Sequence, residues 1–95
     1  MKEEQVLVQR IQQGEKLAFR ELVERYQKKI YYLAYDLTGY HHDAEDLSQE
    51  VFIKAFRSMN NFRGDAKLSS WLYRITVNTA ISQKRKKSKG LKGDS

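Results

Sequence analysis

A long helical pattern of apolar residues between Lys16 and Thr38 constrains the fold more than any other feature of the sequence. Apolar side chains recur there at three- and four-residue steps, and Gly39 follows the last of them. This spacing predicts one helix that buries a single face and stops at the glycine. We expect its tyrosines to pack in a core. The repeating positions are Phe19, Leu22, Val23, Tyr26, Ile30, Leu33, Ala34 and Leu37.

Length and composition limit the chain to one small helical domain. Its 95 residues, 40% of them hydrophobic, are enough for a single core. The sequence has no cysteine, which excludes disulfides, thiolate metal sites and a cysteine nucleophile and favours a reducing compartment. It also has no proline and no apolar run long enough for a membrane span, so we expect a soluble chain without a signal peptide.

Three further helices and one loop follow from apolar spacing and turn residues. The helices are predicted over residues 3–13, about 43–60 and about 69–87. Ser69 is the predicted N-cap of the last helix. Residues 60–68 lose the periodicity and contain Gly64 beside Asp65, which predicts an ordered loop. The predicted fold is therefore all-α, a compact bundle of about four helices with an ordered loop before the last helix.

Charge is distributed unevenly along the chain. Residues 1–52 hold 7 basic and 10 acidic side chains, a net of −3, whereas residues 53–95 hold 11 basic and 2 acidic ones, a net of +9. Charges that only solvate a small surface explain this separation poorly. The two halves therefore predict different partners.

The predicted helix over 43–60 has two contrasting faces on a wheel at about 100° per residue. One arc predicts a contribution to the core and consists of Ala44, Leu47, Val51, Phe52, Ala55 and Met59. The opposite arc surrounds two large apolar groups with polar and acidic ones and consists of Asp46, Gln49, Glu50, Ile53 and Phe56. Such a composition predicts a protein-binding face.

The predicted helix over 69–87 also has two faces. Its inward arc is predicted to be Leu72, Tyr73, Thr76, Val77 and Ala80. Its outward arc mixes stacking, hydrogen-bonding and cationic groups and consists of Trp71, Arg74, Ile75, Asn78, Ser82 and Arg85. Residues 84–92 include six basic side chains, and Gly90 and Gly93 predict a flexible end.

One cluster is rich in metal-ligand residue types, but we expect neither a metal site nor a cofactor. Adjacent histidines point apart on most backbones, and the HExxH pattern is absent. The acids are explained as partners of the helix dipole in the first turn. No GxSxG motif or glycine-rich phosphate loop is present, so no catalytic residue is assigned. The cluster consists of His41, His42, Asp43, Glu45 and Asp46.

Basic residues interleaved with aromatic ones between Lys54 and Lys92 favour nucleic acid as a partner. Lysine and arginine neutralise phosphates, while Phe62 and Trp71 offer flat faces on which unpaired bases stack. Because bases in a duplex are already stacked, exposed aromatic rings favour an opened strand. The basic tail has too few large apolar residues for a membrane role.

Three linked motifs resemble region 2 of bacterial RNA polymerase sigma factors of the extracytoplasmic-function (ECF) group. They are DAEDLSQEVFIKA at 43–55, FRGD at 62–65 and WLYRITVN at 71–78. The similarity covers about residues 4–87. It implies a helical region 2 domain over 1–87, with 88–95 as a basic flexible tail that begins an interdomain linker.

The resemblance also implies partners and site residues. The clamp-helix coiled coil of the polymerase β′ subunit would bind Asp46, Gln49, Glu50, Ile53 and Phe56. The minus-ten promoter element would be read as melted non-template strand, with an extruded base held by Lys54, Ser58, Phe62, Ile75 and Asn78. Trp71 would lie at the duplex junction, and phosphates would meet Tyr73, Arg74 and the basic run 84–87. Arg63, Ser82 and Arg85 complete the predicted DNA-binding set.

By the same resemblance the protein would be a transcription factor of the bacterial cytoplasm rather than an enzyme, and an anti-sigma factor is a further partner type. Two departures from the family are visible. Leu68-Ser69-Ser70 stands where the family often has an aromatic residue and a threonine before the tryptophan. The family's second domain, which reads the minus-35 element, is not part of this chain, so we expect a fragment that binds promoter DNA weakly alone.

Three other functions are open at this point. A duplex-binding regulator with a helix in the major groove would bind duplex more tightly than single strand. An adaptor that binds only proteins would use the acidic arc and leave the basic tail solvated. A metal-dependent enzyme would require an ion at His41 or His42.

Overall fold

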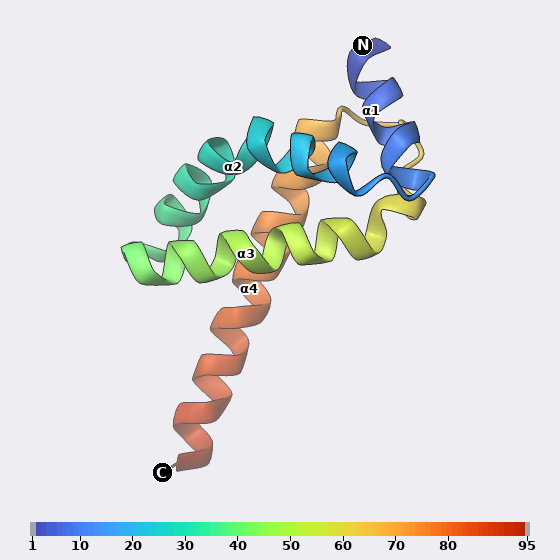
Figure 1. The fold of residues 1–95 in the computed structure, drawn as a ribbon. Helices are drawn as coiled ribbons and strands as arrows, with labels where there is room; N and C mark the ends of the chain where they lie inside the picture. Colours follow the sequence, from blue (N-terminus) through green and yellow to red (C-terminus); the bar gives the residue numbers. More distant parts are fainter. Residues whose placement is uncertain (1, 95) are drawn as a thin grey trace.

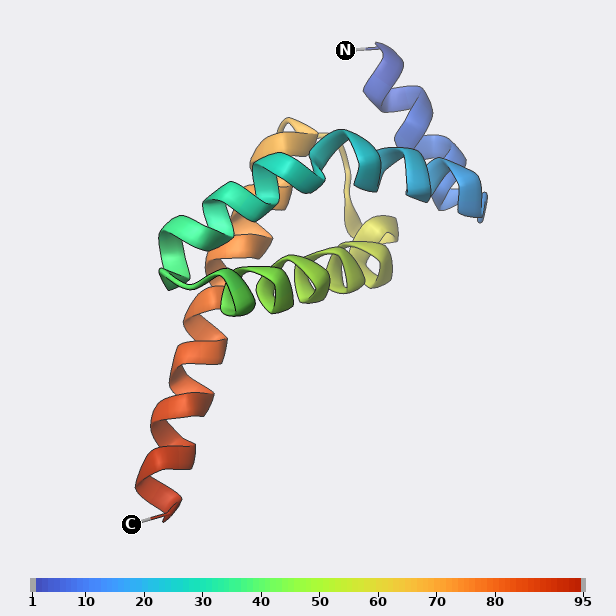
Figure 2. The ribbon, with the colours of Figure 1, turned by 60° about the vertical axis from the view of Figure 1, so that its left-hand side comes forward.

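The computed structural model describes the backbone of residues 2–94 and the side chains of residues 3–86. Its elements are α1 (Lys2–Gln12), α2 (Lys16–Thr38), α3 (His41–Ser58), the short 3-10 helix η1 (Met59–Asn61) and α4 (Leu68–Asp94). The helices α2 and α3 run antiparallel, and α4 crosses them and extends beyond the bundle (Figures 1 and 2). The described residues contain no strand, and the predicted all-α fold is confirmed.

The second helix has the bounds that its apolar pattern predicts. Gly39 follows it with φ 79°, and the Gly39 N–H donates to the Tyr35 carbonyl at 2.7 Å. Glycine adopts this left-handed conformation without a steric penalty, so it ends the helix cleanly. The buried stripe of α2 consists of Ala18, Leu22, Tyr26, Ile30 and Ala34, of which Ala18 was not predicted. The other predicted positions, Phe19, Val23, Leu33 and Leu37, are partly buried. The expectation that the tyrosines of this helix pack in a core was wrong for Tyr32 and Tyr35, which are 65% and 44% exposed.

The core-facing arc of α3 is confirmed, but its N-terminal turn differs from the prediction. Every predicted core residue of this helix is buried. The helix begins at His41, so Asp43 alone is acidic in the first turn. Glu45 and Asp46 instead pair with histidines one turn earlier: His41 Nε2 lies 3.0 Å from Glu45 Oε1, and His42 Nε2 lies 3.5 Å from Asp46 Oδ2.

The prediction for α4 was wrong at both ends. The helix begins at Leu68, and the Lys67 carbonyl accepts the Trp71 N–H at 3.0 Å, so Ser69 is not the N-cap. It continues to Asp94, past residue 87. The boundary between the region 2 domain and the tail stays a prediction.

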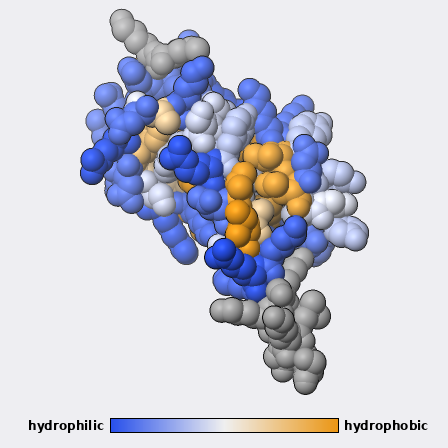
Figure 3. Space-filling model, turned by 180° about the vertical axis from the view of Figure 1, so that it is seen from behind, coloured by the Kyte–Doolittle hydropathy of each residue, from blue (hydrophilic) through white to orange (hydrophobic). Residues whose placement is uncertain are grey.

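The prediction for α4 missed one buried residue and placed one exposed residue in the core. Thr79 is buried, whereas Val77 is 38% exposed. Val77 belongs to an apolar patch over the C-terminal half of α2 and the middle of α4 (Figure 3). There Leu37, Val77 and Ile81 line a cavity of about 290 Å³. Within residues 2–94, no helix combines the length and hydropathy needed to cross a membrane.

A buried tyrosine links α1 to α2. Tyr26 is 6% exposed and donates a hydrogen bond to the Glu4 carboxylate. Burial, together with this hydrogen bond and the Glu4 charge, raises the pKa of Tyr26 well above its ordinary value of 10.0. The folded protein therefore keeps the Tyr26 proton at a pH at which the unfolded chain releases it.

This linkage predicts that the free energy of unfolding falls as the pH rises above about 10, because the unfolded state then binds fewer protons than the folded state. We expect Tyr26→Phe to remove part of that alkaline slope. Urea unfolding measured from about pH 8 to 12 tests this. Tyr40→Phe, at a tyrosine that is 70% exposed, is the control. Equal slopes for wild type and Tyr26→Phe would contradict the expectation.

Candidate nucleic-acid and protein interfaces

The loop that carries Phe62 is held by α1. The side-chain amide of Gln12 donates to the carbonyl of Met59 at 3.0 Å and to the carbonyl of Phe62 at 3.1 Å. The Phe62 N–H donates in turn to the Met59 carbonyl at 3.1 Å. These bonds fix the backbone on which the Phe62 ring stands. The role of Gln12 could not be predicted, because a glutamine on a short amphipathic helix resembles any solvated residue.

Phe62 and Trp71 form an aromatic pair at the edge of the core. Their ring centroids lie 5.1 Å apart with an interplanar angle of 57°. Both rings pack against the core and both are only partly buried. Each therefore keeps some apolar surface that is accessible to a ligand. This arrangement is compatible with base stacking.

A cavity of about 290 Å³ lies beside this loop, on the side of α1. Of the five residues predicted to hold an extruded base, only Phe62 lines it. The other four come from α3 and α4: Lys54, Ser58 and Ile75 are partly buried, and Asn78 is exposed. The remaining lining residues of the cavity are Glu4, Gln5, Val8, Gly64, Asp65, Ala66, Lys67 and Leu68.

The outward arc of α4 has the polar and cationic surface that its sequence predicts. Its exposed members are Arg74, Asn78, Ser82 and Arg85. Trp71 and Ile75 are partly buried, and Arg63 in the preceding loop is exposed. Tyr73 packs against the core and is partly buried, which agrees with its position on the helical wheel. Its predicted contact with phosphates stays a prediction.

The acidic arc of α3 forms a continuous outer face, which we call the α3 outer face and which consists of Asp46, Gln49, Glu50, Ile53 and Phe56. Ile53 is 51% exposed and Phe56 is 55% exposed. Such exposure of large apolar side chains, surrounded by polar ones, is typical of a protein-binding surface. The Phe56 ring makes an edge-on contact with Phe19 of α2, with centroids 5.0 Å apart.

Glu50 of the α3 outer face is tied to α4. The side-chain amide of Gln83 donates to Glu50 Oε2 at 2.8 Å, and Glu50 is partly buried. A shallow cavity of about 450 Å³ runs along this contact and reaches both the α3 outer face and Lys54. Gln83 was missed because the pair spans two helices that are far apart in sequence. The predicted protein face and the predicted DNA face thus share a border.

The histidine cluster does not form a metal centre in the part of the chain that the structure describes. No group of three or more histidine, aspartate or glutamate side chains is arranged to hold an ion there. The Tyr31 hydroxyl contacts His41 Nδ1, and the Glu45 carboxylate lies beside His41 Nε2. Burial and the nearby charge of Glu45 raise the pKa of Tyr31 above its ordinary value. These residues form a local network on the surface.

Comparison with known proteins identifies the family to which this chain belongs. A model of the family described as sigma-70 region 2 matches residues 22–90. The chain belongs to the sigma-70 region 2 family. The predicted resemblance to region 2 of ECF sigma factors is thereby confirmed. A metal-dependent enzyme does not fit this assignment.

Curated sigma factors match this region 2 chain over most of its length. The ECF RNA polymerase sigma-E factor of Escherichia coli K12 is 51% identical over 79 residues, which cover 81% of this chain and 40% of that protein. The RNA polymerase sigma-H factor of Pseudomonas aeruginosa is 49% identical over 78 residues, which cover 82% of this chain and 40% of that protein. The chain therefore spans about two fifths of the length of these relatives.

Two solved structures share the fold. An NMR structure of an engineered region 2 of sigmaE in complex with GTAAAA has a TM-score of 0.85 and 44% identity, and the match covers 92% of this chain and 90% of that one. A structure of CnrH in complex with the cytosolic domain of CnrY has a TM-score of 0.74 and 26% identity, and the match covers 81% of this chain and 50% of that one.

Proposed function

We propose that this region 2 chain binds RNA polymerase through the α3 outer face and recognises the minus-ten promoter element through the Phe62 loop and the outward arc of α4. The element would be read as melted non-template strand with one base flipped out of the stack. The polymerase element bound would be the clamp-helix coiled coil of the β′ subunit. The family is one of transcription initiation factors and not of enzymes, so the mechanism makes and breaks no covalent bond.

The observation that carries this proposal is the combination of two partly exposed aromatic rings with exposed polar and cationic side chains on one stretch of the chain. Phe62 and Trp71 offer apolar faces, and Asn78 offers an amide that pairs with a base edge through two hydrogen bonds. Arg63 and Arg74 are exposed and neutralise phosphates. The relative solved with GTAAAA has 44% identity and supports the same assignment.

Energetics explain why two surfaces are required. Stacking contributes about 1–3 kcal/mol per base. Unstacking and unpairing a base costs a few kcal/mol. Capture of one base therefore stabilises an opened strand but does not melt a promoter. Polymerase must supply the remaining free energy, which makes the α3 outer face as necessary as the DNA-binding surface.

The curated relatives are longer than this chain, and the match covers 40% of their length. We propose that this chain acts in the bacterial cytoplasm with promoter DNA and the polymerase core as partners. An anti-sigma protein is a further partner of the proposed assembly. The solved complex of CnrH with the cytosolic domain of CnrY shows a structural relative bound to another protein domain. Alone, the chain is expected to bind promoter DNA weakly.

Trp71 fluorescence tests strand capture directly. We expect titration with a single-stranded non-template oligonucleotide to change the emission at lower concentration than the matching duplex does. Addition of a β′ coiled-coil fragment distinguishes DNA binding by the free chain from binding that requires polymerase contacts. Tighter binding to the duplex would favour major-groove recognition instead. Polymerase binding without any preference for the non-template sequence would favour the adaptor function.

Asn78→Ala tests whether a base edge is read. We expect the variant to bind its preferred single strand roughly fivefold or more weakly, because a bidentate contact discriminates by about 1–3 kcal/mol. Binding to a scrambled oligonucleotide of the same length should change much less, since phosphate contacts remain. Fluorescence anisotropy of the labelled strands measures both affinities. An equal loss on both strands would show that Asn78 does not read sequence.

A further inference from the structure

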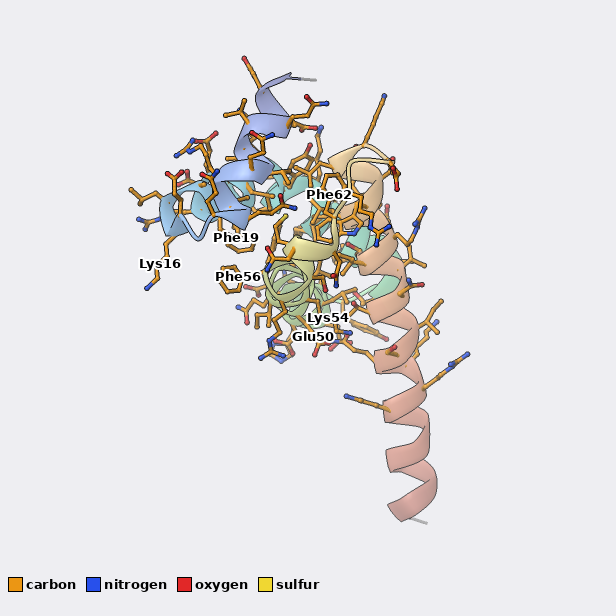
Figure 4. All side chains as sticks on the ribbon, turned by 90° about the vertical axis from the view of Figure 1, so that its right-hand side faces the viewer. Lys16, Phe19, Glu50, Lys54, Phe56 and Phe62 are labelled. Atoms are coloured by element: carbon orange, nitrogen blue, oxygen red, sulfur yellow. The ribbon has the colours of Figure 1, made fainter. Side chains whose placement is uncertain are left out.

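The backbone position of Phe62 depends on one side chain of another helix. Among the residues that the structure describes, Gln12 alone joins α1 to residues 59–67 by side-chain hydrogen bonds, at 3.0 Å to the Met59 carbonyl and 3.1 Å to the Phe62 carbonyl. Farther along the loop, α1 and Lys67 face one another across the cavity of about 290 Å³. Figure 4 shows Phe62 between α1 and the start of α4. The loop is therefore attached to α1 at its beginning and separated from it farther on.

Gln12 is presented from a helix end that is itself fixed. It is the last residue of α1, and Gly14 follows with φ 93°. The Glu15 N–H donates to the Arg10 carbonyl at 3.1 Å, and Arg10 Nε lies 3.3 Å from Glu15 Oε1. Ile11, the residue before Gln12, is buried in the core. The amide of Gln12 thus reaches the loop from an anchored position.

A solvent molecule cannot replace this amide in its connecting role. The Gln12 side chain is exposed, so water can satisfy the Met59 and Phe62 carbonyls if the amide is removed. Water would not, however, join the loop to α1. Loss of the amide should therefore affect the order of the loop more than the stability of the core.

We propose that Gln12 is a positioning residue for strand capture: by donating to two main-chain carbonyls, its amide holds the Phe62 loop in the conformation that stacks with an unpaired base. This inference rests on the proposed function and adds to it a residue of α1, outside the residues 22–90 that match the family model. A loop that holds the binding conformation only part of the time binds with an affinity reduced by that fraction.

Substitutions of equal charge at two adjacent glutamines test whether a donor is required. Gln12→Glu keeps the size of the side chain but replaces the amide with an acceptor-only carboxylate, whereas Gln12→Lys supplies a donor again. Gln13→Glu and Gln13→Lys are the matched controls. Gln13 is also exposed, and its side chain has no hydrogen-bond partner among the described residues. Comparison at equal charge removes the general effect of the added charge on phosphates.

We expect Gln12→Glu to bind the single-stranded non-template oligonucleotide at least roughly fivefold more weakly than Gln13→Glu does. Gln12→Lys should bind within about twofold of Gln13→Lys, because the lysine ammonium donates to the same carbonyls. Fluorescence anisotropy measures these affinities. Hydrogen exchange of the Phe62 N–H in the free proteins measures the order of the loop, and it should be faster in Gln12→Glu than in Gln13→Glu.

Urea unfolding establishes that each variant is folded. If Gln12→Glu does not fold, Gln12→Ala takes its place with Gln13→Ala as its control, and the same loss of strand binding is expected. If Gln12→Glu binds like Gln13→Glu while wild type prefers the single strand to the duplex, the proposal is overturned and the proposed function stands. If Gln12→Lys loses as much affinity against its control as Gln12→Glu does, the loop does not require a donor and the proposal is overturned. If wild type itself shows no preference for the single strand, the proposed function fails and this proposal fails with it.

Discussion

Replacing Ile53 and Phe56 together with alanine is expected to weaken binding to core RNA polymerase by at least roughly thirtyfold. This corresponds to about 2 kcal/mol, the loss that is typical of a hot-spot residue. Both side chains are more than half exposed at the centre of the α3 outer face, so their apolar area is available to a partner. The folding cost should be small, because neither residue belongs to the buried core. Surface plasmon resonance with the core enzyme measures the change.

The chain offers a matched control for this experiment. Val77 and Ile81 are 38% and 46% exposed on α4, in the apolar patch on another side of the molecule. Val77→Ala with Ile81→Ala also removes exposed apolar side chains, but away from the proposed interface. We expect this double variant to bind the core enzyme like wild type. Equal losses from both double variants would contradict the assignment of the α3 outer face.

Phe62→Leu is expected to weaken binding of the single-stranded minus-ten element by roughly fivefold to a hundredfold. The reason is that leucine keeps most of the apolar volume but has no flat face, and stacking contributes about 1–3 kcal/mol per base. The backbone of the loop should stay in place, since Gln12 bonds only to main-chain carbonyls. Fluorescence anisotropy of a labelled non-template oligonucleotide measures the loss.

A second substitution separates stacking from packing. Phe62→Tyr retains the ring and should bind within about threefold of wild type, while both variants should unfold at similar denaturant concentrations. If Phe62→Leu binds as tightly as wild type, Phe62 is a core residue and not a stacking platform. If both variants lose binding and stability together, the effect comes from packing against Trp71.

Sequence periodicity predicts this fold well where a helix has neighbours along its whole length. Most α2 and α3 core positions follow from spacing, because these helices pack against each other and against α4, although Ala18 of α2 was missed. The prediction failed at Val77 because the buried positions Leu72, Thr76 and Thr79 span only about 60° of the helical wheel, and Val77 lies about 100° outside that arc. It failed at Ser69 because the first turn of α4 begins one residue earlier, at the buried Leu68.

The candidate site was predictable only in part. Exposure of Asn78, Ile53 and Phe56 follows from periodicity, because each stands opposite a buried stripe. Gln12 acts through hydrogen bonds to residues that are 47 and 50 positions away in the sequence. Gln83 acts through a hydrogen bond to a residue that is 33 positions away. No local sequence pattern encodes such pairs. Gln12 needs the Met59 and Phe62 carbonyls in place, and Gln83 needs α3 to lie beside α4. Both conditions are met only when the chain has folded.

The hydrogen bonds from Gln12 to the Phe62 loop bear on the residue at which this domain begins. The family match begins at residue 22, after α1 has ended. A protein trimmed to the matched residues would keep the motifs proposed to read the promoter and lose the Gln12 amide that bonds to the carbonyls of Met59 and Phe62. We therefore expect the smallest unit that holds the Phe62 loop in place to begin before residue 22, at an amino end that includes α1.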